Sequence, residues 1–201
     1  MLSQAEKGGV QNTIQNCVTV LQNDPILADS IRLNLLSERI DIVKPMGWQR
    51  SGPTLTDTDM MYILRRMEKY GLYSEKRVSA AIRIVANENH YHPIRDYLNE
   101  LKWDGTARIS RALHRFLGAA EDELTTEALK IFLLGAIKRV FHPGCKFEMM
   151  LCLVGGQGAG KSSFFRLLAI KDEWFSDDLR RLDDDNVFRK LQGTGLWKCR
   201  K

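Results

Sequence analysis

A glycine-rich octapeptide between an apolar run and a helical pattern constrains this chain more than any other feature. Phe147 to Val154 is a continuous apolar run with one charged residue, short enough for a strand buried on both faces. Residues 155–162 follow at once, with the order Gly-Gly-Gln-Gly-Ala-Gly-Lys-Ser, and the pattern from Ser162 to Ile170 predicts a helix. A strand, a tight loop and a helix in this order begin a parallel α/β sheet.

The octapeptide matches the phosphate-loop pattern G-x-x-x-x-G-K-[ST]. Glycine lets the backbone turn tightly enough to aim several N–H groups at one centre without Cβ clashes. The following helix adds its first N–H groups and the positive end of its dipole. In this pattern the lysine reaches the β- and γ-phosphates, and the serine hydroxyl ligates Mg²⁺. We therefore predict ATP with Mg²⁺ as the ligand, Lys161 as the catalytic residue and Ser162 as the metal ligand. The expected nucleotide-binding residues are Gly155, Gly156, Gln157, Gly158, Ala159, Gly160, Lys161, Ser162 and Ser163.

The loop leaves the class of nucleotide-binding protein open. A chance glycine-rich turn would match in about 1% of chains of this length, and the flanking pattern lowers that further. Small-molecule kinases, GTPases, transporters and helicase motors all share the loop. Hydrolysis also needs an acid at the end of a neighbouring strand, which holds Mg²⁺ and orients the attacking water. The candidates Asp177, Asp178 and 183–185 end no apolar strand, and an acidic run is typical of a solvated turn. We therefore expect this chain to lack hydrolysis.

The region before the loop is expected to be mostly α-helical. Thr56 and Asp59 have the spacing of a capping box, and Gly71 is a helix stop. Apolar spacing predicts helices over residues 14–21, 26–36, 56–70, from Ser74, from Pro93 with Leu101 facing inward, up to Leu117, and from about 121 to 141. After residue 143 the helical spacing gives way to an apolar run and a glycine-rich loop. We therefore predict a helical region over 1–143 and a nucleotide-binding domain over 144–201.

Composition excludes some classes of protein and leaves others open. The net charge is +5, but three of the positive charges lie in the last four residues, so charge alone does not establish DNA binding. No apolar run approaches the ~20 residues that span a bilayer, and the N-terminus is polar. Four cysteines lie far apart in the sequence. We therefore expect a cytoplasmic protein with reduced thiols and no membrane partner.

Several segments together resemble the virulence-associated protein E family of phage and genomic-island proteins. They are residues 89–98 (Asn-His-Tyr-His-Pro-Ile-Arg-Asp-Tyr-Leu), 101–105 (Leu-Lys-Trp-Asp-Gly), 139–147 (Arg-Val-Phe-His-Pro-Gly-Cys-Lys-Phe), the phosphate loop and 174–179 (Trp-Phe-Ser-Asp-Asp-Leu). The likeness runs from about Thr56 to Gly193. It implies a replication ATPase of the AAA+ or superfamily 3 helicase type, which works as an oligomeric ring on DNA. The implied fold is an AAA+-like α/β P-loop NTPase with an incomplete parallel sheet, and the implied partners are DNA and, at full length, further copies of the chain.

Outside that resemblance, the same segments have plainer interpretations. His90 and His92 are expected to cap or pack where a helix starts. Trp103 is expected to be a buried aromatic beside a turn. Lys138 and Arg139 are expected to form a solvated helix end that complements the helix dipole.

The two ends of the chain suggest a C-terminally truncated relative. Compared with the family, the chain begins after any primase region and stops before the acidic strand, the sensor residue and the arginine finger. Residues 193–201 fit neither the family nor a fold ending. For one choice of codons, a one-base frame change after Gly193 encodes an apolar strand leading into two glutamates. The rival is a naturally short product or a truncated gene model. With its later strands missing, the run from Phe147 to Val154 is expected to expose apolar residues, so the product is expected to be poorly soluble or to be rescued by a partner.

The leading hypothesis is therefore a fragment of a DNA replication helicase or ATPase of a phage or mobile element. The alternative from another class is a catalytically inactive module that binds nucleotide or joins intact subunits. A small-molecule kinase would need an acceptor-binding region and a lid after the loop.

Overall fold

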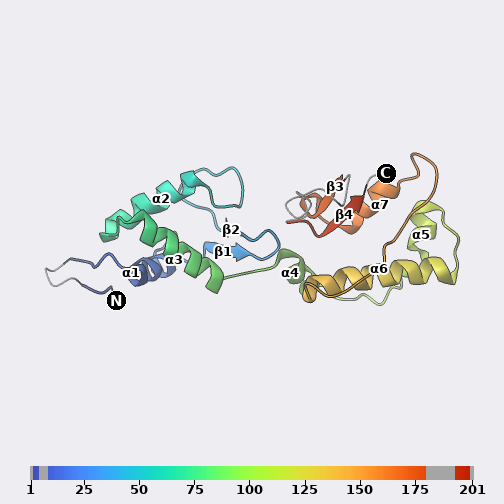
Figure 1. Cartoon of the computed structure of the whole chain (residues 1–201), viewed down its shortest axis with the longest axis horizontal. Helices are drawn as coiled ribbons and strands as arrows, with labels where there is room; N and C mark the ends of the chain where they lie inside the picture. Colours follow the sequence, from blue (N-terminus) through green and yellow to red (C-terminus); the bar gives the residue numbers. More distant parts are fainter. Residues whose placement is uncertain (1, 5–8, 180–192, 200–201) are drawn as a thin grey trace. The chain divides into compact units, whose positions relative to one another are not determined.

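The structure is a computed structural model that describes residues 2–4, 9–179 and 193–199. The chain divides into two compact units, residues 1–93 and 94–201 (Figure 1). The boundary expected near residue 143 falls inside the second unit, so the helices just before the phosphate loop belong to the same unit as the loop. No helix among the described residues is long and apolar enough to cross a membrane.

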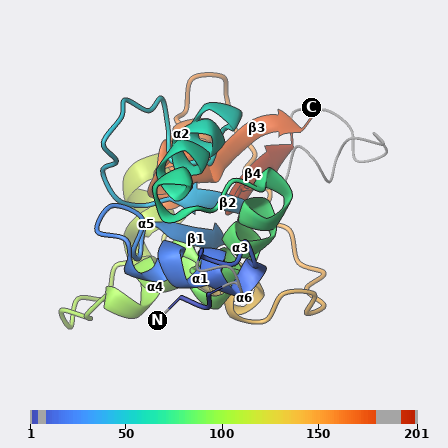
Figure 2. The same cartoon turned by 90° about the vertical axis from the view of Figure 1, so that its left-hand side faces the viewer.

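In the first unit, the described residues form a cluster of helices with a two-stranded hairpin (Figures 1 and 2). Strands β1 and β2 are antiparallel, with Ile31 opposite Ile42. Apolar side chains from the helices and the hairpin share one core. The elements are α1 (Ile14–Asn23), β1 (Ile31–Asn34), β2 (Arg39–Ile42), α2 (Asp57–Met67), the short η1 (Glu68–Tyr70) and α3 (Glu75–Glu88).

The start and end of α2 confirm the sequence prediction. The Thr56 hydroxyl accepts a bond from the Asp59 N–H at 3.2 Å, and the Asp59 carboxylate accepts one from the Thr56 N–H at 2.9 Å. Gly71, at φ 74°, follows η1 in the left-handed conformation that glycine adopts without strain. Trp48 and Arg50 also donate to Asp59, each at 2.8 Å. Burial opposes ionisation of Asp59, but these bonds outweigh it and hold its pKa well below the usual range.

The helix expected over 26–36 is wrong, because a turn and β1 occupy that stretch. Asp24 starts the turn by accepting bonds from the N–H groups of Ile26 at 2.9 Å and Leu27 at 3.1 Å. Its carboxylate also accepts bonds from Arg66 of α2 at 2.6 Å and from the Tyr70 hydroxyl at 2.7 Å. Burial of Asp24 opposes ionisation, but the four bonds together lower its pKa. This anchor spans more than forty residues, so local apolar spacing could not reveal it.

In the second unit, the described residues form helices and a short parallel strand pair (Figure 1). Strands β3 and β4 run parallel, with Phe175 opposite Leu196. Helix α4 is bonded to the end of α6, because Arg95 donates to the Val140 carbonyl at 2.7 Å. The elements are α4 (Pro93–Glu100), α5 (Ile109–Leu117), α6 (Glu123–Phe141), α7 (Lys161–Leu168), η2 (Asp172–Trp174), β3 (Phe175–Leu179) and β4 (Leu196–Cys199).

No strand is assigned over residues 147–154, where the sequence predicts one. A strand needs a hydrogen-bonded neighbour, and among the described residues none runs beside this segment. Its side chains nevertheless alternate: Leu151 and Leu153 pack against the core, while Met150 and Val154 are exposed. The expected exposure of apolar residues is confirmed at Val154, which is 97% exposed.

The turn after α4 also differs from expectation. Trp103 is 83% exposed rather than buried, and Leu101 is exposed rather than inward. Asp104 organises this turn by accepting bonds from the Thr106 N–H at 3.0 Å and from Arg108 at 2.9 Å. A turn held by its own polar groups does not need an aromatic side chain in a core.

Of the two histidines before α4, His92 fits the plainer interpretation, while His90 lies at the end of α3 rather than at the start of a helix. His92 is buried, and His90 Nδ1 lies 2.9 Å from the carbonyl oxygen of Asn87, at the end of α3. Among the described residues, no group of three or more His, Cys, Asp or Glu side chains could hold a metal ion.

Candidate phosphate-binding site

The glycine-rich loop leads directly into the N-terminus of α7. Gly158 and Gly160 have φ angles of 82° and 75°, a conformation that side chains with a Cβ avoid. A Cβ on Gly158 would meet no atom within 4 Å, so this position needs glycine for its backbone conformation and not for space. The helical ladder begins with the bond from the Phe164 N–H to the Gly160 carbonyl, at 2.9 Å. The loop therefore ends where a helix presents its positive pole.

Lys161 folds back over the loop that precedes it. Its ammonium group donates to the carbonyl oxygens of Gly155 at 2.9 Å and Gly156 at 2.6 Å. Both bonds are exposed, so phosphate oxygens could replace the two carbonyls without a large desolvation cost. In the described part of the chain, Lys161 makes no bond or ion pair with a carboxylate. The structure thus brings Lys161 together with the start of the loop.

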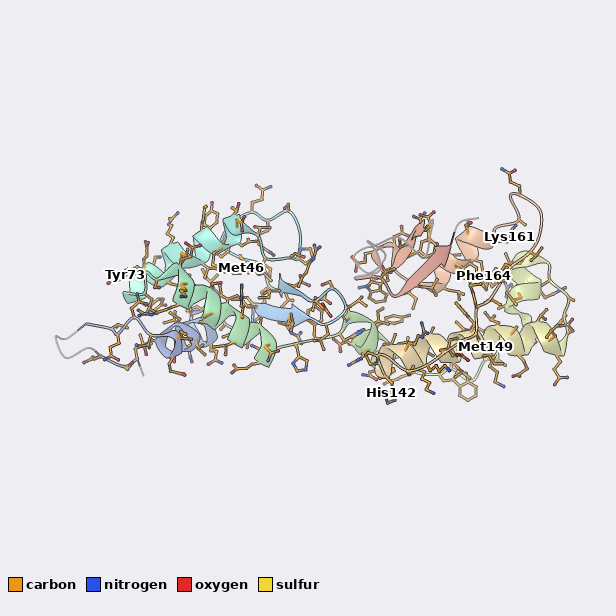
Figure 3. The ribbon with its side chains drawn as sticks, in the orientation of Figure 1. Met46, Tyr73, His142, Met149, Lys161 and Phe164 are labelled. Atoms are coloured by element: carbon orange, nitrogen blue, oxygen red, sulfur yellow. The ribbon has the colours of Figure 1, made fainter. Side chains whose placement is uncertain are left out.

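Packing of α7 fixes the second end of the loop. Phe164 is buried against Leu113 of α5 and Leu129 of α6. The Phe165 ring meets the Phe132 ring edge to face, with centroids 5.9 Å apart. Figure 3 shows Phe164 and Lys161 on α7, with Phe164 on the side toward α6. Two phenylalanines therefore hold the helix whose N-terminus carries the loop.

A close contact between a helix and the preceding segment fixes the first end of the loop. The Phe147 ring lies against Gly135 in the interior of α6, where a Cβ would overlap it. Arg139 of α6 donates to the Phe147 carbonyl at 3.0 Å and lies over its ring. Sequence analysis placed Arg139 at a solvated helix end and assigned no role to Gly135. The available signal was a lone glycine inside a helical pattern, which often marks close packing.

The other predicted residues show what the site does and does not bring together. Ser162 and Ser163 lie in the first turn of α7 and are exposed. Asp177 and Asp178 belong to strand β3, so a solvated turn is the wrong interpretation for these two. Residues 183–185 lie outside the described part of the chain. The acid that would complete a hydrolytic site is therefore not identified by these contacts.

Comparison with known proteins adds one finding. A family model described as the virulence-associated protein E-like domain matches residues 98–199, which is just over half of the chain. The matched range contains the loop, α5, α6, α7 and both strands of the parallel pair. The match starts later than Thr56, where the likeness was expected to begin. It also extends past Gly193, into residues that were expected not to fit the family. No curated protein matches the chain.

Proposed function

Because the chain belongs to the virulence-associated protein E-like family, we propose that residues 155–163 bind the triphosphate of ATP together with Mg²⁺. The observation that carries this proposal is the Lys161 ammonium group, which lies on the carbonyls of Gly155 and Gly156 at the N-terminus of α7. A cation, flexible glycines and a helix N-terminus meet at one exposed loop. The cation and the helix N-terminus attract phosphate, and the glycines let the backbone turn closely around it.

The residues divide the work of binding. Phosphate oxygens take the place of the two carbonyls as acceptors for Lys161, while the loop and the first turn of α7 supply backbone N–H groups. The Ser162 hydroxyl is the metal ligand on the protein side. Mg²⁺ held by Ser162 would supply positive charge beside the phosphates.

The wider role follows from the family. Membership of this family suggests a protein associated with phages or mobile elements. We propose that the chain acts within a DNA replication ATPase of the helicase type, with DNA and further copies of the chain as partners. A second candidate is nucleotide binding without hydrolysis. It is favoured by the contacts of Lys161 in the described part of the chain, none of which brings a carboxylate to the loop.

Binding of a fluorescent ATP analogue to the full chain tests the proposal. Lys161→Ala removes a charge-assisted donor worth about 1.5–3 kcal/mol, so affinity should fall about tenfold to a hundredfold. Lys146→Ala is the matched control, because Lys146 is exposed and, among the described residues, its ion pair is with Glu148 at 2.8 Å. Binding that resists Lys161→Ala, or no binding by the wild-type chain, contradicts the proposal.

A phosphate-release assay, with and without DNA, separates the two candidates. Turnover that DNA stimulates supports the helicase-type role. Tight binding without turnover supports the second candidate.

A further inference from the structure

Helix α6 has an apolar face that the described residues of its own unit leave exposed. One side of the helix is buried in the core through Leu129, and the Phe147 ring covers a separate position, Gly135. On the opposite side, Leu124 is 77% exposed and Leu134 is 57% exposed. Ile131, Ile137 and Phe141 are exposed as well. Exposed apolar side chains gathered on one helix face mark an interaction surface.

The exposed residues follow the spacing of a coiled-coil seam. Positions 124, 127, 131, 134, 138 and 141 are separated alternately by three and four residues, which keeps them on one stripe of a helix. The stripe, named here the α6 seam, consists of Leu124, Glu127, Ile131, Leu134, Lys138 and Phe141. Within the chain, Glu127 pairs with Lys130 at 3.0 Å. Lys138 has no ion-pair partner among the described residues.

The α6 seam is complementary to itself when one copy is reversed. In an antiparallel pair, Leu124 faces Phe141 of the second copy, Ile131 faces Leu134, and Glu127 faces Lys138. Each layer then joins an a position with a d position, and both charges meet their opposites. A parallel pair instead sets Glu127 against Glu127 and Lys138 against Lys138.

From this charge pattern we infer that α6 pairs antiparallel with α6 of a second copy of the chain. The dyad passes between residues 132 and 133, so the contact is isologous and closes on itself. Charged residues inside a seam lower its stability, but they fix register and direction. The helix spans only 19 residues, so we expect a weak dimer that forms at micromolar concentrations. The inference is independent of the phosphate site, and a closed pair differs from the head-to-tail contact of a ring.

Charge exchange tests the pairing in the full chain by sedimentation velocity, from about 1 to about 100 μM. Glu127→Lys alone and Lys138→Glu alone each replace two attractive contacts by two repulsive ones, so each should weaken self-association about tenfold or more. The double variant restores both contacts. An equimolar mixture of the two single variants does so as well, because each supplies the charge that the other lacks.

Two controls keep the result specific. Glu173→Lys makes the same charge change in η2, where Glu173 lies 4.0 Å from Lys171, and should leave association unchanged. Glu127→Lys also removes the bond to Lys130, whereas Lys138→Glu breaks no ion pair among the described residues. Matching effects of the two swaps therefore come from the pairing.

Three results would overturn the inference. They are a wild-type chain that stays monomeric over the whole range, single swaps that leave association unchanged, and a mixture of single variants that fails to associate.

Discussion

Replacing Gly135 with alanine should separate helix propensity from packing at the segment that leads into the phosphate loop. In an ordinary helix interior, Gly→Ala stabilises a protein by about 1 kcal/mol. Gly135 lies inside α6, but a Cβ there would overlap the Phe147 ring. Arg139 holds the Phe147 carbonyl at 3.0 Å and so restrains the backbone, which leaves a change of the ring's side-chain torsions as the way to make room.

The expected magnitude follows from two opposing effects. Overpacking costs about 1–3 kcal/mol, which offsets or exceeds the gain in propensity. Gly135→Ala should therefore be neutral or destabilising by up to about 2 kcal/mol. In a Phe147→Ala background the overlap is gone, and the same substitution should stabilise by about 1 kcal/mol. The coupling between the two positions is then about 1–3 kcal/mol.

Urea denaturation of the four proteins in the cycle, followed by circular dichroism, measures this coupling. The single Phe147→Ala variant serves as the reference, so the cost of losing the ring cancels. Equal stabilisation by Gly135→Ala in both backgrounds would refute the proposed contact. The chain has two units, so the coupling is taken from the unfolding transition that shifts with these substitutions.

Other predictions concern the first unit. Asp24→Asn keeps the side-chain shape but removes the charge that Arg66 contacts at 2.6 Å, so the free energy of unfolding should fall by about 2–4 kcal/mol in urea titrations. The folded-state pKa values of Asp24 and Asp59 are lowered. Their stabilisation is therefore present above the unfolded value of about 4 and is lost as pH falls through the folded values; thermal midpoints between pH 6 and pH 3 should drop, and less so in Asp24→Asn. Thr56→Ala removes the hydroxyl that accepts the Asp59 N–H and should cost about 1 kcal/mol, measurable as a shift in the same thermal midpoint.

The structural features predicted correctly depend on a few adjacent residues. The capping box of Thr56 and Asp59 lies within four positions, and Gly71 ends the helical segment by its own backbone conformation. The positive φ angles of Gly158 and Gly160 likewise follow from the loop pattern. Such features can be read from sequence because their causes are local.

The features that were missed depend on distant partners. The turn at Asp24 is held by Arg66, and the segment before the loop is held by Gly135. Trp103 was expected to be buried because it is a large aromatic residue beside a turn. The bond between Arg108 and Asp104 holds that turn instead, and Trp103 is exposed. The spacing of apolar residues predicts whether a segment is a helix or a strand more readily than it predicts which distant residues hold that segment in place.

The segment 147–154 combines a local sequence pattern with contacts to residues distant in the sequence. Its alternation of packed Leu151 and Leu153 with exposed Met150 and Val154 has the period of a strand, although no described strand accepts its backbone bonds. The segment is therefore held by side-chain packing and by the bond from Arg139 to the Phe147 carbonyl, without a strand ladder among the described residues. The second end of the loop, by contrast, is set by a hydrogen-bonded helix at Gly160. Since a phosphate site needs both ends in place, the weaker restraint at Phe147 limits how well the loop is pre-organised. Disturbing the contact of that ring with Gly135 should lower ATP affinity even though neither residue reaches the phosphates.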